Sequence, residues 1–89
     1  MTDDEMEAVL KNRAMPARIM GVLDMKTHTE AALAERRLGE AVQFVALAPM
    51  DGYDVRASAV LYGKKGTESL RAKDCQQLWA KHGKALVEK

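Results

Sequence analysis

The chain has few aromatic residues, a single cysteine and no long apolar run. Aromatic residues make up 4% of its 89 residues, whereas hydrophobic residues as a whole make up 47%. This composition predicts an aliphatic core rich in alanine and methionine. Because a chain of this length buries only about two-thirds of its unfolded surface, we expect one small domain, residues 1–89, with a marginal core.

The scarcity of cysteine and the charge of the first residues limit the cellular context. Cys75 is the only cysteine, so an internal disulfide is excluded and a zinc site is not expected. No apolar run approaches the roughly 18 residues that a membrane-spanning helix needs. The first segment, Met1-Thr-Asp-Asp-Glu5, is acidic, opposite in charge to a secretory or mitochondrial leader. We therefore expect a cytoplasmic protein that makes no membrane contact.

Motifs for catalysis and cofactor binding are also missing. Neither glycine-rich phosphate-binding pattern, G-x-x-x-x-G-K-[ST] or G-x-G-x-x-G, occurs in the sequence. The histidines His28 and His82 lie far apart in sequence. Cys75 and His82 would share a helix but stand about 10 Å apart along it, too far to act as a pair. We predict a protein that is not an enzyme and that binds no metal or cofactor.

Two apolar runs near the middle of the chain, Val42–Ala48 and Val55–Tyr62, flank a segment rich in turn-forming residues. Asp51 and Gly52 suit a turn, and Pro49 cannot donate to a strand ladder. The second run alternates as a strand does, with one set of side chains on each side: Val55, Ala57, Ala59 and Leu61 against Arg56, Ser58, Val60 and Tyr62. The pattern predicts a central β-hairpin, although Val42–Ala48 also fits a continuation of the preceding helix.

The N-terminal part of the chain carries a helix signal followed by an ambiguous segment. Thr2 and Glu5 have the spacing of a capping box, which predicts a helix from about Asp3 to Ala14. Residues 17–25 alternate as a strand would, but Pro16 also suits the first position of a helix. We favour the strand because the next helix signal follows directly.

That next signal is a second capping-box pair, Thr27 and Glu30. It predicts a helix from about His28 to Leu38, ended by Gly39. After the central hairpin, a loop at residues 63–66 leads into a last helix over residues 68–86. This helix has one apolar face, on which we expect Trp79 to anchor the core: Ala72, Cys75, Leu78, Trp79, His82 and Leu86.

These elements predict an α+β fold in the order α-β-α-β-β-α. The strands over residues 17–25 and 42–48 would be parallel, joined by a right-handed crossover, and the strand over 55–62 would add an antiparallel neighbour. The result is a three-stranded mixed sheet with helices mainly on one face. The other face would stay uncovered, with Val60 and Tyr62 pointing outward, which predicts docking of a partner or a homodimer.

Charge is distributed unevenly although the net charge is only +1. Residues 1–54 contain six Lys/Arg against ten Asp/Glu, and residues 55–89 contain eight against three. Gly63-Lys-Lys-Gly66 resembles the G-x-x-G loop of KH RNA-binding domains, but too little chain follows for that fold. The candidate contacts for a partner protein or a nucleic acid are Arg56, Val60, Tyr62, Lys64, Lys65, Arg71 and Lys73.

The absence of motifs for catalysis and the small size of the chain favour a non-catalytic protein-binding module, such as a regulator, an inhibitor or an assembly factor. Binding to RNA or DNA through the basic residues 56–73 is the alternative, although few aromatic residues are available to stack on bases. The six methionines have two interpretations. They either fill gaps in the core or provide an adaptable binding surface.

Overall fold

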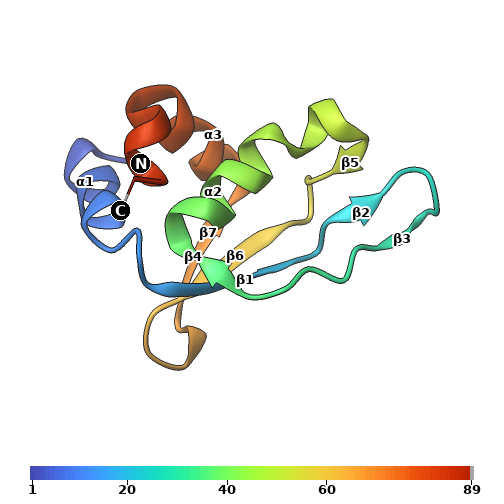
Figure 1. The fold of residues 1–89 in the computed structure, drawn as a ribbon, viewed down its shortest axis with the longest axis horizontal. Helices are drawn as coiled ribbons and strands as arrows, with labels where there is room; N and C mark the ends of the chain where they lie inside the picture. Colours follow the sequence, from blue (N-terminus) through green and yellow to red (C-terminus); the bar gives the residue numbers. More distant parts are fainter. Residues whose placement is uncertain (89) are drawn as a thin grey trace.

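The computed structural model describes residues 1–88, which form helices and two antiparallel sheets (Figure 1). The α-helices within this range are α1 (Asp3–Lys11), α2 (Leu38–Leu47) and α3 (Ala72–His82). The larger sheet has the order β4 (Arg36–Arg37), β1 (Pro16–Met20), β6 (Ala59–Tyr62), β7 (Glu68–Arg71). The smaller has the order β3 (Thr29–Glu30), β2 (Leu23–Asp24), β5 (Tyr53–Asp54). The predicted α+β class is confirmed.

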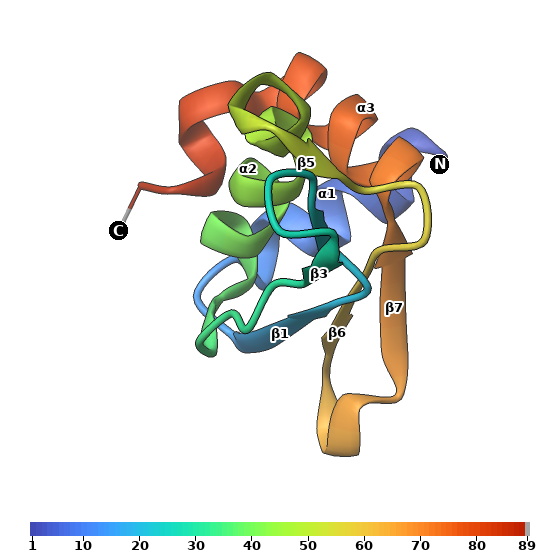
Figure 2. The same ribbon diagram turned by 90° about the vertical axis from the view of Figure 1, so that its right-hand side faces the viewer.

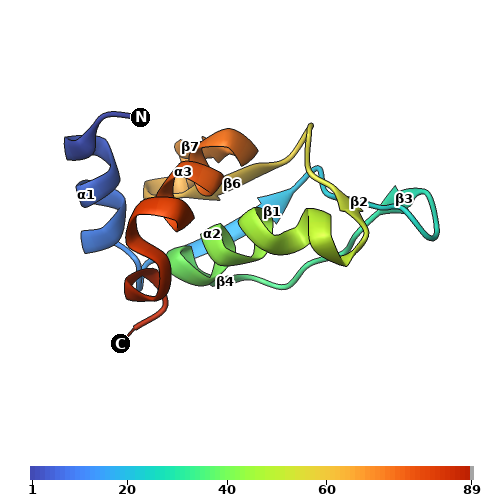
Figure 3. The same ribbon diagram turned by 90° about the horizontal axis from the view of Figure 1, so that it is seen from above.

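The helices α2 and α3 lie on one face of the larger sheet, as Figure 3 shows from above. Under them, Ile19, Val60 and Leu70 pair across β1, β6 and β7, and all three are buried. α2 contacts both β1 and β6, and it also packs against α3. The core is therefore aliphatic and lies between this helical layer and the sheet. Within residues 1–88, no helix is long and apolar enough to cross a membrane.

The predicted N-terminal helix is present, with its capping box. Thr2 Oγ1 accepts a hydrogen bond from the Glu5 backbone N–H at 3.2 Å, and the Thr2 N–H donates to Glu5 Oε1 at 2.7 Å. The helix ends at Lys11, one turn earlier than expected. The strand predicted over residues 17–25 is also present, but Gly21 (φ +74°) divides it into β1 and β2.

The helix predicted over residues 28–38 is wrong, because this segment contains the strands β3 and β4 instead. His28 has φ +57° and donates its backbone N–H to the Asp24 carbonyl at 2.8 Å. The hydroxyls of Thr27 and Thr29 share a hydrogen bond of 2.7 Å. The Thr-x-x-Glu pattern thus builds the turn of a β2–β3 hairpin rather than a helix start.

The strand predicted over Val42–Ala48 is wrong: the segment is helical, as the alternative predicted, but α2 begins at Leu38 and does not continue an earlier helix. The buried residues of α2 include Leu38, Ala41, Val42 and Val45, which follow helical spacing. The predicted parallel pairing is lost with this strand, and every strand pair among the described residues is antiparallel. The expected element order and the single three-stranded sheet are therefore replaced by sheets of four and three strands.

The hairpin of the larger sheet lies one segment later than the predicted central hairpin, between β6 and β7. Its tip is the loop predicted at residues 63–66, in which Gly63, Lys65 and Gly66 all have positive φ. Figure 2 shows this tip projecting away from the helices. β7 occupies the start of the predicted last helix, so α3 begins only at Ala72.

The apolar face predicted for the last helix is buried at three of its six positions, whereas Ala72, Trp79 and His82 are only half-buried. Cys75 and Leu78 are fully buried, and Leu86 in the following turn is 1% exposed. Trp79 is only half-buried and packs against the margin of the core. Leu78 rather than Trp79 is therefore the central residue of this helix.

Cys75 gives a direct test of this packing. Burial raises the pKa of its thiol to about 12, and the neighbouring Asp74 adds a smaller effect. Because the thiolate is the reactive form, we expect modification by a disulfide reagent at pH 8 to be at least about 100-fold slower in the native protein than in the denatured chain. Equal rates would contradict the burial of Cys75.

Candidate functional site

The face of the larger sheet that is turned away from α2 carries its own set of side chains. In β1, Ala17 and Ile19 are buried under the helices, whereas the alternate residues Pro16, Arg18 and Met20 are exposed. The strand register places Leu61 and Ser69 beside Arg18, Ala59 and Arg71 beside Met20, and Arg37 beside Pro16. We call these eight residues the open face: Pro16, Arg18, Met20, Arg37, Ala59, Leu61, Ser69 and Arg71.

The open face combines an apolar centre with positive charge. Met20 is 49% exposed, and Leu61 lies half-buried on the adjacent strand. Arg18 forms no ion pair with any residue from 1 to 88, whereas Arg37 Nε lies 2.8 Å from Glu40 Oε1. Protein interfaces are enriched in arginine and methionine and depleted of acidic residues. The open face has that composition, with three arginines and no acidic residue.

The outward side chains predicted for the strand over residues 55–62 are reversed in the structure. Val60 is fully buried, and Tyr62 is half-buried on the same, helix-facing side. The reversal arises because α2 covers this side of β6. Neither residue therefore belongs to the open face, and Ala59 and Leu61 take the outward positions.

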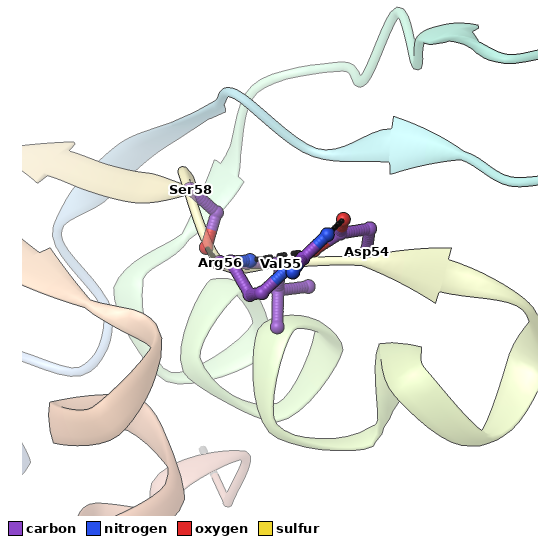
Figure 4. A network of polar contacts seen from close by, with 4 residues as sticks. All are labelled: Asp54, Val55, Arg56 and Ser58. Atoms are coloured by element: carbon purple, nitrogen blue, oxygen red, sulfur yellow. Dashed lines mark hydrogen bonds and ion pairs between the residues drawn. The ribbon is translucent and has the colours of Figure 1, made fainter.

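The predicted basic residues do not form one cluster. Arg71 lies on the open face, Lys64 and Lys65 lie at the tip of the β6–β7 hairpin, and Lys73 is exposed on α3. Arg56 lies in the turn between β5 and β6 and pairs with Asp54 (Figure 4). Of this group, Arg71 shares the open face with Arg18 and Arg37, and Lys65 lines a cavity together with Arg18.

The pair of Arg56 and Asp54 is closely bonded. Arg56 Nη2 lies 2.8 Å from Asp54 Oδ2, and Arg56 Nε lies 3.1 Å from both carboxylate oxygens. The Arg56 backbone N–H also donates to Asp54 Oδ1 at 2.9 Å. Beside them, Ser58 Oγ donates to the Val55 carbonyl at 2.7 Å (Figure 4). The guanidinium group of Arg56 is therefore paired with Asp54 within this turn.

This bonding has a consequence for acid stability. The hydrogen bonds from Arg56 lower the pKa of Asp54 to about 2. A carboxylate whose pKa is lowered by folding stabilises the protein above its ordinary pKa near 3.8, and this contribution is lost as the pH falls toward 2. We expect Asp54→Asn to lower the melting temperature at pH 5, with the difference from wild type disappearing near pH 2. A difference that is constant with pH would contradict the pairing.

The methionines favour the surface interpretation. Met6 is buried, but Met20, Met25 and Met50 have exposed fractions of 49%, 47% and 78%. The interpretation that methionines fill gaps in the core is wrong for these three. Met25 and Met50 lie near the β2–β3 arm, which Figure 1 shows at the end of the molecule opposite α1. Of these three, only Met20 lies on the open face, where a flexible, polarisable side chain suits adaptable contacts.

A cavity beside the open face results from an interrupted hairpin. Arg36 pairs with Ala17, and the Ala31 N–H donates to the Val22 carbonyl at 2.8 Å. The chain advances five residues from Ala17 to Val22 and five from Ala31 to Arg36. Neither segment therefore contains an extra residue. The segment of residues 32–35 nevertheless stays unpaired.

The bonding pattern explains the interruption. At one end the Leu38 N–H donates to the Met15 carbonyl at 2.7 Å, and at the other Ala31 bonds to Val22. Antiparallel ladders bond at every second residue, but Met15 and Val22 stand an odd number of residues apart. The alternation of bonded and non-bonded residue pairs must therefore shift by one residue between Met15 and Val22. Gly21, with φ +74°, lies in this interval.

The interruption leaves a cavity of about 540 Å³, which we call the slot. Ile19 and Met20 line one wall, Ala31–Ala34 line the other, and Arg18 and Glu30 lie at its borders. Most residues of the slot are apolar, but Arg18 and Glu30 make part of its lining polar, and the slot shares Arg18 and Met20 with the open face. The sequence contains no direct signal for the slot, because Ala31–Ala34 fall within the helix predicted from the Thr27 and Glu30 pair.

A second cavity of about 410 Å³ lies between α1 and the strands β6 and β7. It is bordered by Glu5, Glu68 and Asp74, and Tyr62 also lines it. Burial raises the pKa of the Tyr62 hydroxyl, and the three carboxylates raise it further. Glu5 and Asp74 already accept hydrogen bonds from the N-terminal ends of α1 and α3, which gives them structural roles.

Comparisons of this chain with protein-family models, with curated proteins and with solved structures found no match.

Proposed function

We propose that this chain is a small, non-catalytic protein-binding module of the cytoplasm, acting as a regulator, an inhibitor or an assembly factor. The observation that carries the proposal is the open face, where Met20 and Leu61 lie among three arginines with no α-helix of residues 1–88 over them (Figure 1). An exposed apolar surface ringed by polar residues is typical of an interaction site. Arginine is also among the residues that contribute most to binding energy.

A different protein fits the open face better than a second copy. Two stacked sheets lie about 10 Å apart, so a face-to-face homodimer would bring two sets of arginines into one layer. Like charges opposed across an interface cost several kcal/mol. The contact expected from Val60 and Tyr62 is also lost, because both face the helices. We therefore favour a partner of different sequence over the homodimer.

Binding to RNA or DNA is the second candidate, and two exposed lysines favour it. Lys64 and Lys65 project at the tip of the β6–β7 hairpin, on the same sheet as Arg18 and Arg71. However, the open face carries no aromatic residue on which a base could stack. The charge of Arg56 is also engaged by Asp54. For these reasons we propose a protein rather than a nucleic acid as the ligand.

The test compares capture by two double variants of matched chemistry. The open-face variant is Met20→Glu with Arg71→Glu, and the control is Met50→Glu with Lys73→Glu. All four residues are exposed, so circular dichroism should show native folding for both variants. We expect a protein captured from native lysate by the wild type and the control to be lost with the open-face variant, with or without nuclease.

Other results would count against the proposal. Equal loss with both variants would show that capture depends on charge alone. Loss of the captured protein on nuclease treatment would favour the nucleic-acid candidate. Direct binding to RNA or DNA should then weaken with salt, with a log–log slope of about −0.7 to −0.9 per phosphate contact.

A further inference from the structure

We infer that the partner presents an acidic amphipathic helix to the open face, with one large apolar side chain entering the slot. This inference rests on the proposed function and specifies the element that binds. It depends on three properties of the described residues: the size of the open face, its charge and the position of the slot.

The size of the open face suits a single helix. β1 has five residues and is about 16 Å long at about 3.3 Å per residue, and a helix of ten residues is about 15 Å long. On the opposite face, α2 has ten residues and contacts the two central strands, β1 and β6. A partner helix of similar length would cover the outward side chains of the same strands. The sheet would then lie between two helical layers.

The positive charge of the open face favours acidic residues on both flanks of that helix. Arg71 and Arg37 lie on the outer strands β7 and β4, and Arg18 lies on the inner strand β1, beside Leu61. Carboxylates along both sides of an apolar ridge would meet these guanidinium groups. Because arginine binds carboxylates with paired hydrogen bonds, such contacts also fix the orientation of the helix.

The slot supplies an anchor point beside this ridge. It opens next to Arg18 and Met20, which belong to both the slot and the open face. Its walls are formed by Ile19 and Ala31–Ala34. Tightly binding residues in interfaces are large side chains that fill desolvated pockets. A leucine, phenylalanine or tryptophan on the partner helix would fill this role.

The probe is a labelled, covalently stapled helical peptide of about 14 residues, with leucine at every third or fourth position and glutamate elsewhere. Fluorescence anisotropy should show that it binds the wild type at least about tenfold more tightly than the matched leucine–lysine peptide. Arg18→Glu with Arg71→Glu should weaken binding by at least about tenfold. The control, Lys11→Glu with Lys73→Glu, should change it by less than about twofold.

A double-mutant cycle tests the slot separately. Replacing the central leucine of the peptide with alanine should weaken binding to the wild type by about tenfold. Ala34→Phe fills the slot from an exposed position, so the same peptide change should then have little effect. An equal effect on both proteins would overturn the anchor.

The helix inference and the proposed function can fail separately. No binding of the leucine–glutamate peptide, or equal binding of both peptides, would overturn the helix inference. If the open-face variant still abolished capture of a protein, the proposed function would stand. If capture also survived that variant, both would be lost.

Discussion

The Leu78→Ala variant is expected to lose about 2–5 kcal/mol of its free energy of unfolding. Leu78 is fully buried on α3 and belongs to the same core as Val42, Val45 and Cys75. Removing its side chain leaves a cavity in a domain whose total stability is only about 5–15 kcal/mol. Urea unfolding followed by circular dichroism would measure the loss.

The matched control is Gln76→Ala, two residues away on the exposed face of α3. It should change the free energy of unfolding by less than about 0.5 kcal/mol. Trp79→Ala should cost less than Leu78→Ala, because Trp79 is only half-buried. If the tryptophan variant were the more damaging one, the core would be centred on Trp79, as its sequence position suggested.

The Gly39→Ala variant is expected to lose about 2–3 kcal/mol or more, the upper part of the range for inserting an atom into a packed core. Gly39 lies in the first turn of α2, and a Cβ atom there would stand 1.7 Å from the Leu86 carbonyl oxygen. The obstacle is backbone rather than a flexible side chain. The turn Gly83–Leu86 would have to move away from α2, which thermal unfolding would detect.

Gly52→Ala separates this packing effect from the ordinary cost of replacing glycine. Gly52 has φ +87°, but an added Cβ would meet no described atom within 4 Å. Its loss should be limited to the strain of a left-handed backbone, about 1–2 kcal/mol. A Gly39→Ala variant as stable as the wild type would contradict the close contact between α2 and Leu86.

Local signals predicted the elements that depend on local interactions. The capping pair of Thr2 and Glu5 correctly placed the start of α1, and the glycines at 63 and 66 correctly placed a loop. The alternation of residues 16–20 was also visible in the sequence. Each of these features is stabilised within a few residues, so a single sequence contains the information.

The errors arose where distant contacts decide the structure. Val42–Ala48 has the β-branched and aromatic content of a strand, but Val42 and Val45 lie against α3 and the sheet at helical spacing. The pair of Thr27 and Glu30 resembles a helix start, but β2 and β3 pair across it. Propensity gives only a weak preference in such segments, and tertiary packing overrides it.

The open face was predicted in kind, but Arg71 is the one candidate contact residue that belongs to it. Helices on one side of a sheet imply an uncovered side, and the sequence allowed that inference. Which set of side chains in residues 59–62 faces outward depends on where α2 packs, and α2 was assigned to other residues. Arg18 and Met20 were placed on a strand, but the register that brings them beside Leu61 and Arg71 is a long-range feature.

The most direct test of the open face is site-specific photo-crosslinking in native cells. A photoreactive amino acid is placed at Met20 in one protein and at Met50 in the control, both exposed positions. The proposed function predicts a nuclease-resistant protein adduct from position 20 that is absent from position 50. The same adducts from both positions, or only nucleic-acid adducts from position 20, would contradict a protein-binding open face.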